Sequence, residues 1–380
     1  MSRVMIFGNA FWEYTGYGTQ ALQLARQLRK NGHEVACAAF HGLHGAPLGY
    51  EGFTVYPGSL EDPWALDVLG AHCRHFGADL LITLMDAWVL DPAKLAGMNV
   101  AHWMPVDCEP LSAMDRKILD AGGGRPVAMS RFGEKQMRAA GYEPLYAPHA
   151  LDMQGIWKPL EDREAARRTL GLHDRFVVGL NAANQDPFRK GFGEQLHAFA
   201  AFVRKHDDAL MLIHSRAETR QGVNLNALIA GVGLTSRHVM IGDQYLNAAG
   251  LIGEAQMASW HGVPDLLTNC SYGEGFGLAV LQSQAAGTPV VVTNFSAMAE
   301  LCGAGWKVRG QPFWNRGHDA EWRVPFISEI TKAYEKAYDQ AAGLRDKARA
   351  FALAYDADRV YADFWAPALK ELNPGWVTSW

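Results

Sequence analysis

The stretch Ser271–Val292 decides the fold and reads Ser-Tyr-Gly-Glu-Gly-Phe-Gly-Leu-Ala-Val-Leu-Gln-Ser-Gln-Ala-Ala-Gly-Thr-Pro-Val-Val-Val. It begins as a glycine-rich loop in which Gly273, Gly275 and Gly277 alternate with larger residues. Glycine tolerates positive φ angles and has no side chain, so such a loop can approach a ligand closely. The pattern predicts a loop built to lie against a bound molecule.

A helix followed by a buried strand is predicted after this loop. The helix runs over Leu278–Ala286 and ends at Gly287, the residue type that most often terminates a helix. Pro289 cannot continue a helix, and the three valines of Val290–Val292 are typical of a buried strand. Together these elements form a loop–helix–strand unit of a parallel α/β sheet.

The N-terminal end of this helix is suited to an anion. Backbone N–H groups in the first turn have no partner within the helix, and they carry a partial positive charge that favours phosphate. Glu274 precedes the helix, and Gln282 follows Glu274 by eight residues, slightly more than two helical turns. We therefore expect a polar ligand with a phosphate group at this point.

The stretch resembles the signature of retaining nucleotide-sugar glycosyltransferases of family four. Their pattern is Glu-Gly-Phe-Gly-Leu, then a second Glu after seven intervening residues, then Ala, a small residue, Gly, Pro, Val and Val. The resemblance implies that Glu274 holds sugar hydroxyls and that Gln282 reaches the ribose of the nucleotide. Gln282 departs from the family's Glu and has no charge, so it predicts weaker hydrogen bonds to those hydroxyls. The compact signature also resembles enzymes of phage type.

The resemblance implies the GT-B fold, an α/β architecture in which two Rossmann-like doubly wound domains face a central cleft. We expect an acceptor-side domain over residues 1–155, which ends near Pro148-His149-Ala150-Leu151-Asp152, similar to the family's interdomain segment. A donor domain is expected over residues 156–345. The last segment, residues 346–380, is expected to be a C-terminal helix that returns to the first domain.

Composition agrees with a globular enzyme of two domains. The chain has 380 residues, 49% hydrophobic and 20% charged, which is too long for one typical core and unlike a disordered protein. The net charge is −5, and the first 150 residues hold 12 Lys and Arg against 15 Asp and Glu, which disfavours long nucleic acid as a partner. The five cysteines are scattered and include no Cys-x-x-Cys pair, which favours a reducing compartment. Because the sequence shows no signal peptide and no apolar run of membrane length, we expect a cytoplasmic location.

The N-terminal region is predicted to be a β–α–β unit. Strand Val4–Gly8 leads into a loop over Asn9–Thr19, then a helix over Gln20–Asn31. The glycines of this loop, Gly16 and Gly18, formally fit a dinucleotide fingerprint, but they lie too far past the strand for its tight turn. The family resemblance implies instead that they face the donor phosphates; the alternative is a flexible loop.

Candidate acceptor-side residues follow two later strands, because ligands of α/β proteins bind at the carboxyl ends of parallel strands. Asp86 follows the strand predicted over Asp79–Leu84, where family members often carry a catalytic His that is missing here. Asp86 is expected to contact the sugar or the acceptor, or to cap the next turn. His102 lies in the predicted strand Val100–Trp103, and Asp107 follows that strand. Both are candidate acceptor-binding residues, and a structural role is the alternative for His102.

Further donor-binding residues are implied by the family's Gly-Arg … Lys-Gly pattern, whose basic residues clamp the diphosphate. Lys190-Gly191 matches its second half, and Arg189 stands directly before Lys190 instead of at the usual spacing. A fixed cation near a departing phosphate stabilises the charge that develops there. His214 and Tyr245, each at or just beyond a predicted strand, are expected near the nucleotide. The remaining donor-site residues come from the signature and are Gly275, Phe276, Gly277 and Leu278.

The sequence therefore predicts a retaining glycosyltransferase that moves a hexose from a UDP- or GDP-sugar to an unidentified hydroxyl. Glu274, Lys190 and Asp86 are the expected catalytic residues. The resemblance implies that no metal or other cofactor is required. The acceptor stays open among a glycan, a protein, a small molecule and a hydroxylated base in DNA. Two alternatives also stay open: a nucleotide-sugar epimerase of the same fold, and a sugar- or nucleotide-binding protein without catalysis.

Overall fold

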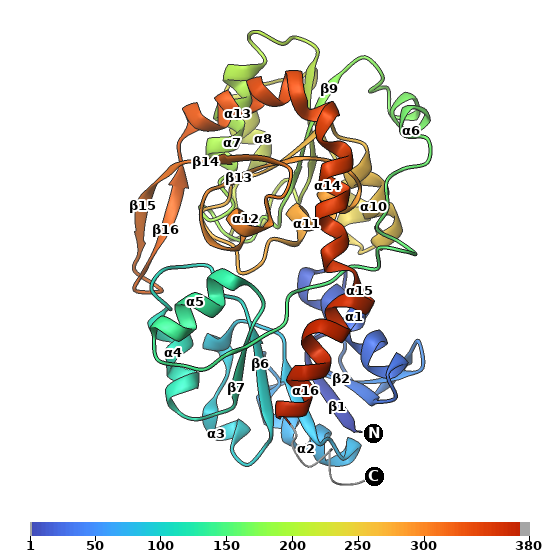
Figure 1. The fold of residues 1–380 in the computed structure, drawn as a ribbon, viewed down its shortest axis with the longest axis vertical. Helices are drawn as coiled ribbons and strands as arrows, with labels where there is room; N and C mark the ends of the chain where they lie inside the picture. The colour runs from blue at the N-terminus through green and yellow to red at the C-terminus, as the bar shows by residue number, and fades with distance from the viewer. Residues whose placement is uncertain (1, 373–380) are drawn as a thin grey trace. The chain divides into compact units, whose positions relative to one another are not determined.

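The structure is a computed structural model that describes residues 2–372, and its chain divides into two compact units. Within the described residues, unit 1 comprises residues 2–151, 315–320 and 355–372, and unit 2 comprises residues 152–314 and 321–354. These limits do not coincide residue for residue with the domains expected from the sequence, whose limits stay predictions. Each unit is built around its own sheet (Figure 1).

Unit 1 contains an eight-stranded sheet in the order β3-β4-β2-β1-β5-β6-β7-β8. All neighbouring strands are parallel except the pair β3 and β4. The central strands are buried on both faces, which explains why the sequence of β1 is almost entirely apolar. The strands are β1 Arg3–Asn9, β2 Glu34–His41, β3 Leu48–Tyr50, β4 Phe53–Tyr56, β5 Leu80–Thr83, β6 Val100–Met104, β7 Arg125–Ala128 and β8 Leu145–Tyr146.

The first helix, α1 Gly16–Lys30, begins four residues earlier than the sequence predicted. The Thr15 side chain accepts a hydrogen bond from the Gly18 N–H and caps the helix. Gly16 and Gly18 thus lie in the first helical turn, and the expected glycine-rich loop is corrected to residues 10–15. At Gly18 a Cβ atom would stand 2.1 Å from the Glu13 carbonyl oxygen, so glycine is needed here for close packing.

The other helices of unit 1 connect its strands or close the chain. Side-chain caps fix four of them, those of α4 and α5 being serines: Ser112 accepts from the Asp115 N–H and Ser130 from the Gly133 N–H, while Asp91 and Asp356 cap α3 and α15. The C-terminal elements of the described chain belong to this unit. The helices are α2 Leu66–Phe76, η1 Ala87–Val89, α3 Pro92–Leu95, α4 Ala113–Asp120, α5 Arg131–Ala139, α15 Ala357–Val360, η4 Tyr361–Trp365 and α16 Ala366–Leu372.

Unit 2 contains a six-stranded parallel sheet in the order β11-β10-β9-β12-β13-β14. The chain order changes direction beside β9, which is where open parallel sheets bind ligands at the carboxyl ends of their strands. The strands are β9 Phe176–Asn181, β10 Ala209–His214, β11 Val239–Ile241, β12 Leu266–Asn269, β13 Val290–Thr293 and β14 Gly305–Val308. The α/β class and the doubly wound pattern expected from the sequence are confirmed.

Two features of unit 2 differ from the sequence prediction. A helix predicted over residues 248–261 begins only at Glu254, because Gly250 takes a φ of 64° after the short helix that ends at Ala248. A two-stranded sheet, β15 Gly310–Asn315 and β16 Ala320–Pro325, was not predicted, and its connecting residues 315–320 belong to unit 1. The helices are α6 Arg163–Thr169, α7 Phe192–Phe202, α8 Leu225–Gly231, α9 Gln244–Ala248, α10 Glu254–Gly262, α11 Leu278–Ala285, α12 Ser296–Leu301, α13 Ile327–Gln340, η2 Ala341–Leu344 and α14 Arg345–Ala352, with η3 Leu353–Tyr355 spanning the boundary.

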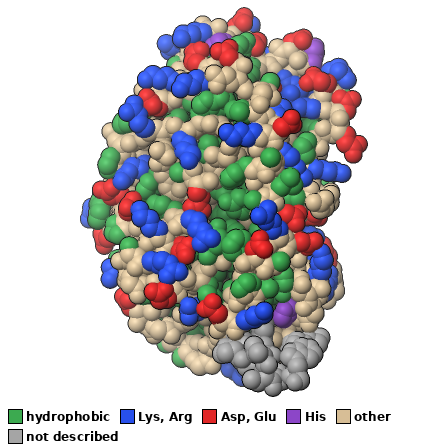
Figure 2. All heavy atoms as spheres, in the orientation of Figure 1, with side chains coloured by type: hydrophobic (Ala, Val, Ile, Leu, Met, Phe, Trp, Pro, Cys, Tyr) green, Lys and Arg blue, Asp and Glu red, His purple; other side chains and the backbone are tan. Residues whose placement is uncertain are grey.

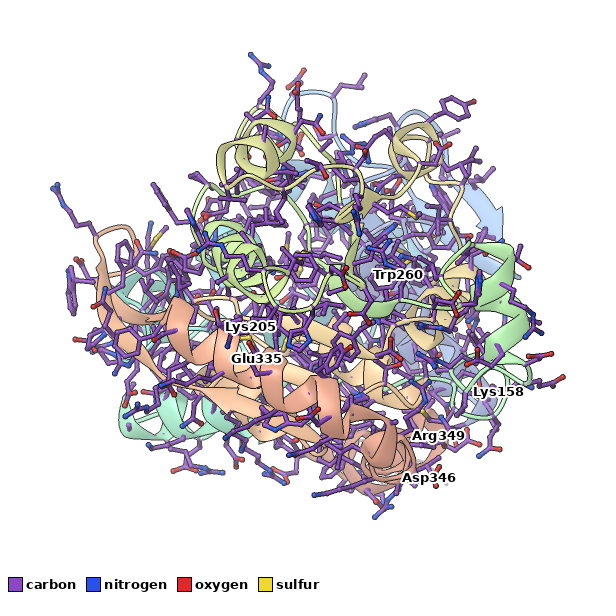
Figure 3. All side chains as sticks on the ribbon, turned by 90° about the horizontal axis from the view of Figure 1, so that it is seen from above. Lys158, Lys205, Trp260, Glu335, Asp346 and Arg349 are labelled. Atoms are coloured by element: carbon purple, nitrogen blue, oxygen red, sulfur yellow. The ribbon has the colours of Figure 1, made fainter. Side chains whose placement is uncertain are left out.

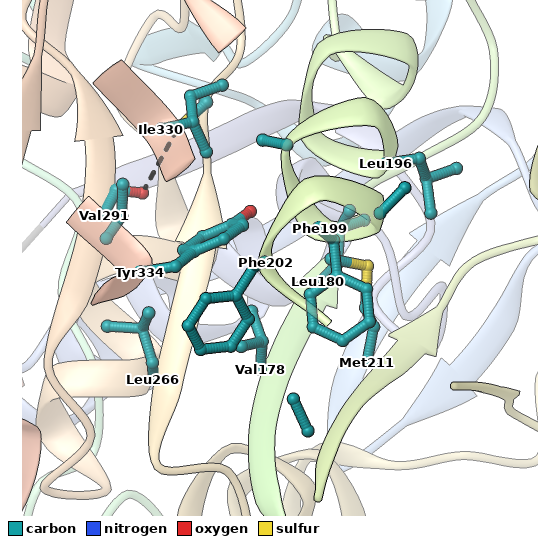
Figure 4. Close-up of a cluster of buried hydrophobic side chains, with 14 of the residues drawn as sticks. Val178, Leu180, Leu196, Phe199, Phe202, Met211, Leu266, Val291, Ile330 and Tyr334 are labelled. Carbon is teal, nitrogen blue, oxygen red and sulfur yellow. Dashed lines mark hydrogen bonds between the residues drawn. The ribbon is translucent and has the colours of Figure 1, made fainter. Parts of the chain in front are cut away.

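The core of unit 2 is formed where α7 and α13 pack on the sheet (Figures 1 and 4). Phe199 and Phe202 of α7 and Tyr334 of α13 are fully buried, and their ring centroids lie 5.8–6.4 Å apart. Aromatic pairs at such distances add to the free energy gained by burying apolar area. This core holds rigid the strands that end at the site described below.

The surface carries charges of both signs. Figure 2 shows lysine and arginine interspersed with aspartate and glutamate over the visible face. One such pair joins α13 to the segment after α7, where Lys205 Nζ lies 3.2 Å from a Glu335 carboxylate oxygen (Figure 3). Among residues 2–372, every helix is too short or too polar to span a lipid bilayer.

We predict that Phe202→Ala lowers the free energy of unfolding by about 3–5 kcal/mol, because it opens a cavity among rigid aromatic neighbours. Chemical denaturation of both proteins measures the difference. Phe188→Ala is the matched control, since Phe188 is 61% exposed and its removal leaves no cavity. A loss for Phe202→Ala no larger than that of the control would contradict the packing described here.

Candidate active site

A buried carboxylate with two cations forms the centre of the candidate site. Lys190 Nζ donates a hydrogen bond of 2.6 Å to Glu274 Oε1, and Arg189 Nη1 lies 3.2 Å from Glu274 Oε2. The side chains of Glu274 and Lys190 are only 11% and 12% exposed. Lys190 and Arg189 precede Glu274 by 84 and 85 positions in the sequence, and the fold brings all three residues together.

The cations keep this carboxylate ionised. Burial alone would raise the pKa of Glu274, but the charges of Lys190 and Arg189 and the hydrogen bonds of Lys190 and Ser271 lower that pKa to about 2. The Ser271 hydroxyl donates to Glu274 Oε1 at 2.7 Å. Glu274 is therefore a strong hydrogen-bond acceptor that a ligand's hydroxyl groups can use.

The loop that carries the two cations is shaped by Asp186 and Gly191. The Asp186 carboxylate accepts from the Phe188 and Arg189 N–H groups and fixes the turn. Gly191 has a φ of 59° at the start of α7, and a Cβ atom there would lie 2.5 Å from the Cys270 carbonyl oxygen. Only glycine allows this loop to approach the end of β12 so closely, which places Lys190 opposite Glu274.

A buried glutamine, which the sequence analysis did not identify, connects this loop to the core. Gln195 on α7 is 1% exposed. Its Nε2 donates to the Lys190 and Gly191 carbonyl oxygens, while its Oε1 accepts from the Cys270 N–H and the Thr268 hydroxyl. No periodicity or motif in the sequence distinguishes this glutamine from a surface residue.

The backbone of Glu274 is held by a strained serine. The Glu274 N–H donates to Ser296 Oγ at 3.0 Å. Ser296 has a φ of 52°, a left-handed value that non-glycine residues rarely adopt. Thr293 donates to the Ser271 carbonyl oxygen and ties the same loop to β13. Two strand ends thus fix the position of Glu274.

Of the three glycines around Glu274, only Gly277 has a positive φ, 96°, at the start of α11. The expectation of positive φ at Gly273 and Gly275 is therefore wrong. Within the described chain no side chain caps α11, so the partial positive charge of its N-terminus is available to an anion. Gly275 and Phe276 are buried, and Leu278 is half-buried.

The two glutamines of α11 have different roles. Gln284 is buried; it donates to the Leu301 carbonyl oxygen and accepts from the Gly303 and Ala304 N–H groups, which makes it structural. Gln282 is half-buried, and its side-chain amide makes no hydrogen bond within residues 2–372. Gln282 is thus the polar group on this helix that a ligand can reach.

The nucleotide-side candidates lie at neighbouring strand ends. His214 ends β10, where burial lowers its pKa, and its ring lies 5.9 Å from that of Trp260. Tyr245 is on the short helix α9 after β11 and is 73% exposed. His214 ends one strand, and Tyr245 follows another strand, of the sheet beside which Glu274 lies. Among the described residues, neither side chain forms a hydrogen bond or ion pair with Glu274, Lys190 or Arg189.

The acceptor-side candidates belong to unit 1, and one of them is corrected. His102 is fully buried, and its ring nitrogens lie 3.0 Å from Thr83 Oγ1 and 2.9 Å from the Gly123 carbonyl oxygen. Its environment is that of a structural residue, so it is not exposed to an acceptor. Asp86 is half-buried and accepts a 3.3 Å hydrogen bond from Tyr17; it makes no side-chain cap. Asp107 is half-buried beyond β6.

The sequence contains one Asp-x-Asp spacing, a pattern that can mark a metal site. Its two carboxylates are used otherwise. Asp356 accepts from the Asp358 N–H and caps α15, and Asp358 forms an ion pair of 2.7 Å with Lys30. This spacing is therefore structural.

Comparison with protein families identifies the class of protein that the chain resembles. Residues 180–316, most of which belong to unit 2, match the family model "Glycosyl transferases group 1". The matched region contains Lys190, Glu274 and Gln282. The resemblance to GT-B glycosyltransferases of the family-four type is thus confirmed.

Two curated relatives are D-inositol 3-phosphate glycosyltransferases. The protein of Streptomyces scabiei is 28% identical over 151 residues, which are 37% of this chain and 31% of the relative. That of Pseudarthrobacter chlorophenolicus is 32% identical over 98 residues, 26% of this chain and 21% of the relative. The aligned regions span less than a third of these relatives' length.

Two solved structures share the fold over nearly the whole chain. Sucrose-phosphate synthase from Thermosynechococcus elongatus has a TM-score of 0.76 at 13% identity and covers 99% of this chain and 100% of its own. HepE from Anabaena, in complex with UDP and glucose, has a TM-score of 0.71 at 15% identity, and the match covers 97% of this chain and 100% of HepE. At this identity the comparison confirms the GT-B fold.

We predict that the stabilising effect of Glu274 disappears in acid. The folded pKa of about 2 lies below the carboxyl's ordinary value of 4.5, so the ion pairs contribute on the order of 3 kcal/mol above pH 4.5, and this is lost as the pH falls toward 2. Glu274→Gln should therefore be less stable than the wild type at pH 7, with a difference that shrinks between pH 4.5 and 2.

Denaturation of wild type and variant at several pH values measures this difference. The control is Glu161→Gln at an exposed position, which should differ little from the wild type at any pH. A Glu274→Gln difference that stays constant from pH 7 to pH 2 would show that the carboxylate is not held by the two cations.

Proposed function

We propose that this protein is a retaining glycosyltransferase that moves a sugar from a nucleotide-diphospho-sugar to a hydroxyl group of an acceptor. The observation that carries the proposal is the buried Glu274 carboxylate paired with Lys190 and Arg189 before the uncapped N-terminus of α11. This arrangement offers an acceptor of hydrogen bonds for sugar hydroxyls and three positive groups for a diphosphate.

Each residue has a distinct role in the proposed reaction. Glu274 accepts hydrogen bonds from sugar hydroxyls, and Gln282 binds the ribose. Lys190, Arg189 and the start of α11 stabilise the negative charge that develops on the departing diphosphate. The bond between the sugar's anomeric carbon and the phosphate oxygen breaks, the acceptor oxygen bonds to that carbon on the same face, and the acceptor's proton passes to the leaving phosphate.

A UDP-sugar is the donor we favour. HepE was solved with UDP-glucose as well as with UDP and glucose, and it shares this fold. One sequence relative is named for D-inositol 3-phosphate, and one structural neighbour is named for sucrose phosphate. Each of these molecules is a phosphorylated polyol or sugar. A small hydroxylated molecule is thus a reasonable first acceptor to test, alongside glycans and hydroxylated DNA bases.

A panel of nucleotide sugars tests the donor site and separates the alternatives. We expect one donor to raise the melting temperature and to release its nucleoside diphosphate, slowly without an acceptor, and we expect Glu274→Ala to lose both effects. Conversion of the donor to another nucleotide sugar without acceptor would indicate an epimerase. Stabilisation without release or transfer would indicate a binding protein.

Lys190→Ala should lower kcat by about 30- to 1000-fold, which corresponds to about 2–4 kcal/mol of barrier, because the departing phosphate loses a fixed cation. Steady-state rates of nucleoside diphosphate release measure the effect. Lys190→Arg keeps the charge and should retain more activity than Lys190→Ala.

Lys205→Ala is the matched control, because Lys205 is 72% exposed and pairs with Glu335 on the α7–α13 side of the unit. It should leave kcat unchanged. If Lys190→Ala turns over as fast as this control, then Lys190 takes no part in stabilising the leaving group.

A further inference from the structure

Three side chains of unit 1 bring metal-binding atoms close to one another. They are Asp107 and Cys108, in the segment after β6, and His318, in the connection between β15 and β16. One carboxylate oxygen, the sulfur and one imidazole nitrogen all lie within 4.8 Å of one another. Cys108 is 1% exposed, and the other two residues are half-buried.

The ligand types are those that zinc prefers. Zinc binds thiolate sulfur, imidazole nitrogen and carboxylate oxygen, with bonds of about 2.0–2.3 Å in tetrahedral geometry. Ligand atoms around such an ion are about 3.3–3.8 Å apart, so the observed group needs only small side-chain rotations to close on it. A hard cation such as Mg²⁺ would instead favour oxygen ligands and avoid the thiol.

The surroundings of the three ligands are negative. The charges that act most strongly on Cys108 are those of Asp107 and Asp115, and Asp115 is in turn influenced by Asp107 and Asp86. Anions gathered in a buried region repel one another, and a divalent cation among them removes this repulsion.

The positions of the ligands are fixed by the backbone. Ser112, four residues after Cys108, accepts a hydrogen bond from the Asp115 N–H at 3.0 Å and fixes the start of α4. The His318 carbonyl oxygen accepts from the Ala113 N–H at 3.3 Å, which ties the β15–β16 connection to the start of α4. The ligands thus come from two segments, each anchored by its main chain.

We propose that Asp107, Cys108 and His318 bind one Zn²⁺ ion, with water in the fourth position. On binding, the Cys108 thiol releases its proton to solvent and the sulfur bonds to zinc, with no change in oxidation state. The ion would join segments about 210 residues apart and stabilise the folded chain, since it binds the folded state and not the unfolded one.

Titration of the metal-stripped full chain with Co²⁺ and Zn²⁺ tests this site. We expect one Co²⁺ per chain, with the absorption of a tetrahedral ion and a thiolate-to-cobalt charge-transfer band, and displacement by Zn²⁺. Cys108→Ser should abolish the thiolate band, and His318→Gln should weaken binding by on the order of 100-fold or more. Zn²⁺ should raise the melting temperature of the wild type and not of Cys108→Ser.

Two variants serve as controls, because they remove the same residue types elsewhere. Cys302→Ser changes a partly exposed free cysteine of unit 2, and His173→Gln changes an exposed histidine. Both should bind Co²⁺ like the wild type. The proposal is wrong if the wild type takes up no stoichiometric Co²⁺, or if Cys108→Ser and His318→Gln bind it as the controls do.

Discussion

The buried ion pairs of Glu274 are the interaction on which the candidate site of unit 2 depends. A carboxylate that is 11% exposed stays ionised only because Lys190 and Arg189 compensate for its lost hydration. These residues come together because the loop before α7 approaches closely at Gly191 and because Gln195 hydrogen-bonds both to that loop and to the end of β12. The core of Phe199, Phe202 and Tyr334 supports this arrangement from below the sheet.

This arrangement also explains why the site is suited to an anionic sugar donor. In the chain both cations contact the one Glu274 carboxylate, so the three groups together keep one positive charge. A diphosphate offers Lys190 and Arg189 alternative partners, while sugar hydroxyls offer Glu274 new donors. A ligand that has both groups exchanges every lost contact for a new one, and a ligand that has only one of them does not.

Much of this was predictable because local sequence determines it. The glycine and valine pattern of Ser271–Val292 identified the loop, the helix and the strand, and the resemblance of Lys190-Gly191 to the family's Lys-Gly pattern identified Lys190. What sequence could not show is contact across long separations. Gln195 and Ser296 act through hydrogen bonds to distant backbone, and His318 lies in the connection that follows β15, a largely exposed strand. For His102 the sequence left an acceptor contact and a structural role open, because burial is decided by the neighbouring strands.

A crystal structure of the chain with a bound nucleoside diphosphate sugar tests the central claim most directly. The account predicts phosphate oxygens within about 3.2 Å of Lys190 Nζ and the Arg189 guanidinium, and a sugar hydroxyl at the same distance from the Glu274 carboxylate. The ribose should lie at Gln282. A nucleotide sugar bound elsewhere, with the Lys190–Glu274 pair intact, would contradict the account.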